Sequence, residues 1–329
     1  MRSNIFVFFI LIIAGISCRK SNYIPPVYPV PPDSLMNWKV ISNLSGSSMF
    51  LSDIWFTSAS RGFTLGDKLY QTIDGGMSWS EIPIDPWTNS FENLFFVNPQ
   101  FGFAQAPGQL ASTLDGGNSW TVQSLPNDSA QTIFFTSPTT GFYGNDNSGG
   151  LKKTTDAGRT WSTVFSDPGN PQNYYPWFLT SDTGFVATGS GAFASTSDGG
   201  QTWQPRTGIL PVNQYFYSYN QLFFLDKNNG FYACPSGILK TTDGGQSWKS
   251  VLSDSANQIG TSAINVIRFV DANTGYYKGL SAIYKSSDGG KTWSLNCKLG
   301  SDYFIGMYFL DIHNGWACTG KGRIIRIQQ

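Results

Sequence analysis

Charged residues are scarce in this chain of 329 residues. Lys, Arg, Asp and Glu make up only 13% of it, about half the usual share, and 21 basic side chains balance 21 acidic ones. A neutral chain without a basic run argues against a nucleic-acid binder, which needs a positive surface to collect phosphates. The single histidine, His313, argues against most zinc sites and against nucleophilic catalysis that depends on histidine.

Cysteine is also rare, and its spacing gives no metal motif. The chain has four cysteines and no CxxC pair, so no metal site and no cofactor are expected. The disulfide state of Cys234, Cys297 and Cys318 stays open at this point. Abundant residues are aromatic ones, at 16%, together with 36 glycines and 17 prolines. This composition predicts a turn-rich, all-β protein.

The first 35 residues read as a targeting segment and a spacer. A positive start, an apolar run from Ile5 to Ile13 and small residues predict a signal peptide over residues 1–17. The run is too short to span a bilayer as a helix. Small residues just before Cys18 resemble a bacterial lipobox, which implies that Cys18 is lipidated. The protein would then be anchored in the cell envelope, at the outer membrane or the cell surface. The alternative is secretion without a lipid anchor. A proline-rich linker completes residues 18–35.

One turn motif recurs six times, at spacings of 41 to 45 residues. Each copy has an aspartate, one or two glycines, a Ser or Thr and a tryptophan, as in Asp74-Gly75-Gly76-Met77-Ser78-Trp79. The carboxylate can accept hydrogen bonds from N–H groups of its own turn, and the tryptophan can begin a buried strand. The motif resembles the Asp-box, or BNR repeat, of β-propellers. The resemblance implies a structural role for Asp74, Asp115, Asp156, Asp198, Asp243 and Asp288.

A second pattern occurs seven times and sets the number of blades. It is an apolar strand followed by a polar turn and a glycine next to an aromatic residue, as in Ile54–Phe63 and, lastly, Met307–Trp316. The seventh copy has no Asp-box after it, so its outer strand is expected to come from the N-terminus, with Trp38 in the place of the missing box tryptophan. Residues 36–329 are therefore predicted to form a seven-bladed β-propeller closed by an N-terminal strand.

The face opposite the Asp-boxes collects most polar and aromatic residues that the repeat leaves unexplained. Acids such as Asp167 and Asp302 and aromatic pairs such as Tyr303-Phe304 are expected there. Flat rings and amides at the mouth of a channel suit a neutral extended ligand, either a peptide or a glycan. The residues predicted to bind it are Asp53, Trp87, Glu92, Gln131, Tyr174, Tyr175, Tyr217, Asn220, Gln221, Asn265 and Arg268. Packing of these aromatics against one another within long loops is the alternative.

Residues 36–329 resemble the photosystem II stability/assembly factor-like propellers, whose repeats read like Ser286-Ser287-Asp288-Gly289-Gly290-Lys291-Thr292-Trp293. The resemblance implies a non-catalytic protein that binds protein partners, as an assembly or scaffold factor. The chain is also expected to be a monomer. The arginine cluster of the photosynthetic members is absent, because only Arg268 lies near the rim. This difference puts a photosystem role in doubt and favours a relative in the bacterial envelope.

Glycoside hydrolysis is the alternative function, since sialidases and xyloglucanase-type enzymes also carry Asp-boxes. The sialidase arginine triad is missing, and xyloglucanase-type enzymes use two propellers where this chain has one. A hydrolase would need only two carboxylates, and Asp53 with Glu92 on adjacent blades are the candidates.

Overall fold

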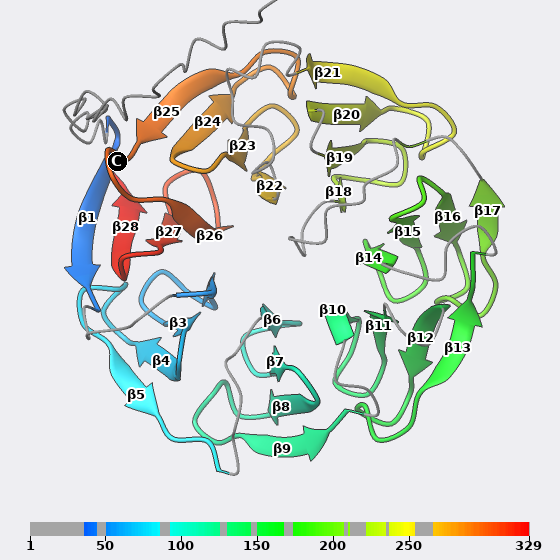
Figure 1. Ribbon diagram of the computed structural model, residues 1–329, viewed down its shortest axis with the longest axis horizontal. Helices are drawn as coiled ribbons and strands as arrows, with labels where there is room; N and C mark the ends of the chain where they lie inside the picture. Colours follow the sequence, from blue (N-terminus) through cyan, green and yellow to red (C-terminus); the bar gives the residue numbers. More distant parts are fainter. Residues whose placement is uncertain are drawn as a thin grey trace, which may run out of the picture. The chain divides into compact units, whose positions relative to one another are not determined.

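The computed structural model is a ring of seven four-stranded antiparallel sheets (Figure 1). It describes residues 36–44, 51–85, 93–125, 130–145, 150–167, 174–206, 210, 222–234, 237–253 and 266–328. Each sheet is one blade, and its strands run outward from the central channel in chain order, except in blade 7, where the first strand of the chain is outermost. The predicted seven-bladed propeller is confirmed. Among the described residues, no helix is long and apolar enough to cross a membrane.

The strands of each blade follow from the inside to the outside. Blade 1 holds β2 (Asp53–Phe56), β3 (Gly62–Leu65), β4 (Leu69–Thr72) and β5 (Ser80–Ile82); blade 2 holds β6 (Asn93–Phe96), β7 (Gly102–Ala106), β8 (Gln109–Thr113) and β9 (Thr121–Ser124). Blade 3 holds β10 (Ala130–Phe135), β11 (Gly141–Asn145), β12 (Gly150–Thr154) and β13 (Ser162–Phe165); blade 4 holds β14 (Tyr174–Phe178), β15 (Gly184–Thr188), β16 (Phe193–Thr196) and β17 (Gln204–Arg206). Blade 5 holds β18 (Leu222–Phe224), β19 (Gly230–Cys234), β20 (Gly237–Thr241) and β21 (Lys249–Ser253); blade 6 holds β22 (Val266–Phe269), β23 (Gly275–Lys278), β24 (Ala282–Ser286) and β25 (Ser294–Lys298). Blade 7 holds β26 (Phe304–Phe309), β27 (Gly315–Thr319), β28 (Arg323–Ile327) and β1 (Trp38–Asn43).

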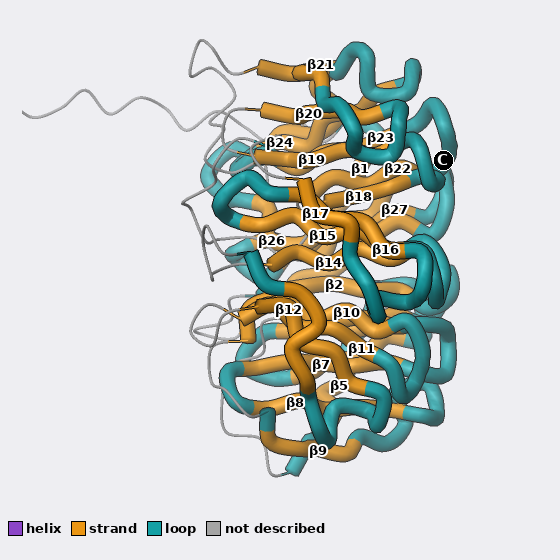
Figure 2. The backbone as a smooth tube through the Cα atoms, turned by 90° about the vertical axis from the view of Figure 1, so that its right-hand side faces the viewer, coloured by secondary structure: helices purple, strands orange, loops and turns teal. Residues whose placement is uncertain are grey.

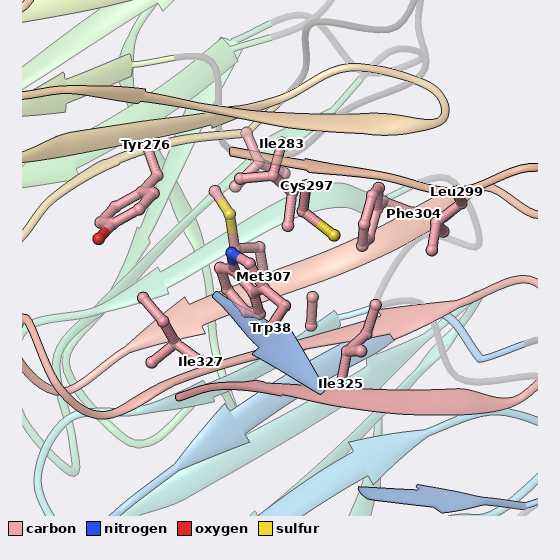
Figure 3. Packing of buried hydrophobic residues seen from close by; sticks show 11 residues of the cluster. Trp38, Tyr276, Ile283, Cys297, Leu299, Phe304, Met307, Ile325 and Ile327 are labelled. Atoms are coloured by element: carbon pink, nitrogen blue, oxygen red, sulfur yellow. The ribbon is translucent and has the colours of Figure 1, made fainter. Parts of the chain in front are cut away.

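The two ends of the chain close the ring in blade 7. Strand β1 pairs antiparallel with β28, so that Trp38 lies opposite Ile327. The Trp38 side chain is 2% exposed and donates from Nε1 to Asn296 Oδ1 at 2.7 Å. Figure 3 shows it among Tyr276, Met307 and other apolar residues of blades 6 and 7. The predicted closure by the N-terminal strand is therefore confirmed.

Every blade repeats one aromatic contact with the blade before it. A phenylalanine of the innermost strand stacks on an aromatic ring of the second strand of the preceding blade, with centroids 3.6 to 4.8 Å apart. The pairs are Trp316–Phe56, Phe63–Phe96, Phe103–Phe135, Phe142–Phe178, Phe185–Phe224, Phe231–Phe269 and Tyr276–Phe309. Burial of these rings, with favourable stacking geometry, holds neighbouring blades together.

The glycine that follows each inner strand makes room for that phenylalanine. A Cβ placed on Gly230 would come within 2.6 Å of the Phe224 ring, and one on Gly315 within 2.3 Å of Phe309. Such distances are too short for any side chain. The repeated glycine is thus required by close packing within the blade.

The Asp-box is a self-contained turn in which the aspartate bonds to its own backbone. In the fourth box, Asp198 Oδ1 accepts hydrogen bonds from the N–H groups of Gln201 and Thr202, each at 2.9 Å. Oδ2 accepts from the Thr202 hydroxyl at 2.6 Å. Hydrogen bonds from the serine of its box likewise lower the pKa of Asp74 to about 2. Both carboxylate oxygens are occupied by hydrogen bonds within the turn, which supports a structural role for the aspartate.

Trp38 occupies the position of a box tryptophan, since it meets Phe309 edge-on at 5.8 Å as Trp248 meets Phe224 at 6.0 Å. Trp38→Ala should therefore lower the free energy of unfolding by about 3–5 kcal/mol, measured by denaturant titration. Deletion of residues 19–33 is the control and should leave stability unchanged. If deletion through Val40 also leaves it unchanged, β1 does not close the ring.

Candidate binding face around the central channel

The central channel is lined by one side chain from each innermost strand. These are Trp55, Phe95, Phe134, Trp177, Phe223, Arg268 and Tyr308, which precede the stacked phenylalanines by one residue. Adjacent rings touch around the axis: Trp55 lies 4.4 Å from Tyr308 and 5.1 Å from Phe95, centroid to centroid. Alternation along a strand turns successive side chains to opposite faces of the sheet, so the residue before each stacked phenylalanine lies on the other face, where it contacts its counterparts of the neighbouring blades around the axis. The channel wall is therefore six aromatic rings and one guanidinium.

Arg268 is the exception in this wall, and it is partly exposed. Its Cζ lies 5.8 Å from the centroid of the Trp177 ring, and one terminal nitrogen donates to the Ile267 carbonyl at 2.9 Å. Burial lowers the pKa of Arg268 to about 10, while the nearby Asp53 charge acts in the opposite direction. The group stays cationic at neutral pH and keeps further N–H donors for a ligand.

Asp53 begins β2 at the mouth of the channel, and its carboxylate is held in place by the backbone. Oδ1 accepts from the N–H of Ile54 at 2.8 Å, and Oδ2 accepts from the N–H of Leu94 in blade 2 at 3.1 Å. Burial raises the pKa of Asp53 to about 6, although both N–H groups and Arg268 favour the charged form. Asp53 thus joins two blades.

The surroundings of Asp53 are tightly packed on the side of blade 7. A Cβ on Gly306 would come within 3.1 Å of Cys318 Sγ and 3.2 Å of the Asp53 carboxylate. Burial raises the pKa of the Cys318 thiol to about 12. Lys278, which is 3% exposed, donates to the Phe304 carbonyl at 3.0 Å, and burial lowers its pKa to about 8. Cys234, Cys297 and Cys318 are all buried free thiols.

The structure brings only part of the predicted binding set together. Asp53 and Arg268 both belong to inner strands, and each charge favours the charged form of the other. Six predicted residues lie outside the described residues, namely Trp87, Glu92, Tyr217, Asn220, Gln221 and Asn265. Gln131 lies in β10, but its side chain is not described. Those seven assignments stay predictions.

Tyr174 and Tyr175 are not exposed aromatics of the binding face. They lie in β14 and are 0% and 4% exposed. The Tyr174 hydroxyl accepts from the Asp167 N–H at 2.9 Å, and its ring meets Phe165 edge-on. The expectation that these rings stack on a ligand is wrong, because both side chains are buried, with Tyr174 in the core that blades 3 and 4 share.

Two acids and one aromatic residue expected on this face are buried as well. Asp302 is 4% exposed and forms an ion pair with Arg323 at 2.9 Å. Asp167 is 5% exposed and accepts hydrogen bonds from the Thr188 and Ser190 hydroxyls. Phe304, 1% exposed, belongs to the core of blades 6 and 7. Partners about 20 residues away along the chain hold the two acids, and core packing buries Phe304.

Sequence reasoning missed the aromatic channel wall as a candidate site. The residues predicted to bind a ligand do not include Trp55, Phe95, Phe134, Phe223 and Tyr308, although these form one column in the alignment of the seven repeats. That column, with Arg268 as its one charge, was the available signal. Within the described residues, no cluster of three or more His, Cys, Asp or Glu side chains could hold a metal ion.

Comparison with known proteins identifies the family. The family model described as photosynthesis system II assembly factor YCF48 matches residues 31–173 and 174–301. The chain belongs to this family. A curated relative, the photosystem II assembly lipoprotein Ycf48 of Synechococcus sp. (strain CC9902), is 25% identical over 207 residues. That match covers 56% of this chain and 55% of the relative, so the chain aligns with only about half the length of the relative.

Solved structures show the same fold at low identity. A structure of YCF48 bound to a D1 peptide superposes with a TM-score of 0.66 and 19% identity, covering 92% of this chain and all of that one. A GH74 enzyme of Niastella koreensis superposes with a TM-score of 0.62 and 16% identity, covering 88% of this chain and 53% of the enzyme. Fold similarity therefore includes both binding proteins and glycosidases, and the function has to be argued from the site.

The raised pKa of Asp53 predicts a specific pH dependence of stability. The folded protein binds this proton more tightly than the unfolded chain, whose pKa is near 3.8, so the free energy of unfolding should fall as pH rises from about 4 to above 6. The loss is at most about 3 kcal/mol, less any screening by solvent. The box aspartates, whose pKa is lowered, act in the opposite direction near pH 4, so the Asp53 contribution has to be isolated by denaturant titrations of the native protein and a variant without this carboxyl.

Asp53→Asn is the matched comparison, because the amide does not titrate while the box aspartates titrate in both proteins. The difference in unfolding free energy between the two proteins should therefore change with pH across the same interval. A constant difference would mean that Asp53 has an ordinary pKa.

Proposed function

We propose that the protein is a non-catalytic, lipid-anchored assembly factor of the bacterial cell envelope that binds a peptide segment of a protein partner at the channel mouth. The observation that carries the proposal is the channel wall, in which Arg268 is the single cation among six aromatic rings. Flat rings contact proline, aliphatic and aromatic side chains, and a guanidinium pairs with a carboxylate or carbonyl oxygen. Membership in a family of assembly factors supports a protein partner.

The structure of one relative supports a peptide rather than a glycan as the ligand. The fold is shared with a YCF48 structure that contains a D1 peptide, which supports peptide binding as the family's mode of recognition. With only one arginine in the channel wall, this chain is expected to bind a less acidic segment than a ligand for an arginine cluster. The partner is proposed to be an envelope protein rather than a photosystem subunit.

Glycoside hydrolysis is less well supported by the geometry of Asp53. A pKa near 6 suits a general acid, but both carboxylate oxygens already accept backbone N–H groups. A side chain held in this way connects two blades and is poorly placed to protonate a leaving group. The glycosidase hypothesis therefore depends on Glu92, which lies outside the described residues.

Arg268→Gln tests peptide binding. The variant should weaken capture of the partner about tenfold or more, because it removes the one charge of the channel wall. Partners are first trapped from envelope extracts by cross-linking and mass spectrometry, and the trapped segment is then synthesised for fluorescence anisotropy. Arg159→Gln, an equal loss of charge in the exposed third Asp-box, is the control and should bind normally.

Equal affinity of both variants would contradict binding at the channel. Turnover of xyloglucan by the native protein, abolished in Asp53→Asn, would instead establish the glycosidase.

The lipid anchor has its own test. The leader sequence and the lipoprotein name of the Synechococcus relative support acylation at Cys18. Cys18→Ala should abolish incorporation of labelled fatty acid and move the protein from the membrane to the soluble fraction. Ser21→Ala, in the linker, should do neither. Fatty-acid labelling that persists in Cys18→Ala would contradict the anchor.

A further inference from the structure

Exposed apolar side chains are concentrated on one part of the Asp-box face. The described residues contain eight large hydrophobic side chains that are exposed, and six of these belong to turns of blades 7, 1 and 2. We call the six the apolar crest: Met36, Ile73, Met77, Leu114, Leu310 and Ile312. Ile73 is 73% exposed and Leu114 65%. Exposure this high has a free-energy cost in water that the fold itself does not require.

Hydrogen bonds place the crest on a single face. Each Asp-box is bonded to the first turn of its own blade, as Gly75 N–H donates to the Ser60 carbonyl at 2.8 Å. Strand β1 begins beside the end of β28, where Trp38 lies opposite Ile327, so Met36 is at this same end. Figure 2 shows these turns along the right-hand side of the ring, together with the C-terminus.

The repeat shows that the apolar residues are not needed for folding. The residue before each box aspartate is exposed in all six boxes. It is Ile73 and Leu114 in blades 1 and 2, whereas Thr155, Ser197, Thr242 and Ser287 take its place in blades 3 to 6. Met77 likewise corresponds to Asn118, Arg159, Gln201, Gln246 and Lys291. The same turn forms with polar residues at these positions, so the fold does not require apolar side chains there.

Basic residues lie beside the crest, where blade 7 has no Asp-box. A cavity of about 390 Å³ opens there, lined by Lys39, Ile41, His313, Arg326, Ile327 and Gln328. Lys39 is exposed, and Arg326 is partly exposed with its guanidinium over the Trp316 ring at 5.0 Å. Aliphatic side chains next to Lys and Arg are typical of surfaces that contact the interface of a bilayer.

We propose that the apolar crest docks on a lipid bilayer, with Lys39 and Arg326 facing lipid phosphates and the channel mouth directed away from the membrane. The proposal builds on the lipid anchor proposed above. Residues 19–35, 17 in number, separate Cys18 from Met36, which is itself part of the crest. A linker of this length confines the propeller near the bilayer without orienting it. Docking of the crest supplies the orientation.

An environment-sensitive fluorophore reports whether the crest enters lipid. The chain from residue 19 onward, with a hexahistidine tag in place of the acylated cysteine, is held on vesicles of phosphatidylethanolamine, phosphatidylglycerol and a nickel-chelating lipid. Leu114→Cys is labelled with nitrobenzoxadiazole, and Thr155→Cys, at the matched position of the third box, is the control. The native cysteines are buried and should not react in the folded protein.

The Leu114→Cys label is expected to shift to shorter wavelength and brighten several-fold on vesicles, while the Thr155→Cys label stays unchanged. Ile73→Ser combined with Lys39→Gln should reduce the shift of the Leu114→Cys label. Labels that both remain in water, or that both shift equally, would overturn the docking. So would a shift of the Leu114→Cys label in solution that grows with protein concentration, because a second copy would then cover the crest.

The tag makes this result independent of acylation. A soluble Cys18→Ala protein with a Leu114→Cys label that enters lipid supports both the anchor and the docking. Acylation that is lost in Cys18→Ala, together with a Leu114→Cys label that stays in water, supports the anchor alone and overturns the docking.

Discussion

Stacking of one aromatic ring on another between successive blades is the contact on which the ring depends. A phenylalanine of each inner strand lies on a ring of the preceding blade, as Phe135 lies on Phe103 with centroids 3.6 Å apart. The glycine column exists because the same phenylalanine occupies the space over it. The box tryptophan then packs edge-on, as Trp161 does against Phe135. The inner-strand phenylalanine, the ring of the preceding blade and the box tryptophan thus fix how each blade packs on the next. Seven copies of this contact close the ring.

Closure makes the two chain ends part of the same repeat. The fourth strand of blade 7 is β1, so no Asp-box turn joins it to β28, and Trp38 of β1 makes the edge-on contact with Phe309. Six blades have an Asp-box on this face and blade 7 has none; the cavity lined by Lys39, His313 and Arg326 lies at blade 7. The blade that closes the ring is therefore also the blade whose turns on the Asp-box face differ most from those of the other six.

The two faces of the ring carry different chemistry because they are built from different parts of the repeat. Short turns stabilised by their own aspartates form the Asp-box face. An exposed position such as that of Ile73 can hold an apolar or a polar residue without disturbing the turn. The channel is formed by inner strands, in which Arg268 and Asp53 keep their charges in a largely aromatic setting. The proposed partner recognition at the channel and the proposed membrane docking at the boxes would therefore use separate surfaces of one domain.

The sequence by itself determined the number of blades, the closure by Trp38 and the structural role of the box aspartates. These features follow from local contacts that recur with a fixed period, so a single chain contains its own alignment. Tertiary structure decided which side chains are available at the channel. Tyr174, Tyr175, Asp167 and Asp302 look free in the sequence but are buried by packing between strands and loops distant along the chain. Burial depends on what lies opposite in space, and the repeat pattern does not contain that information.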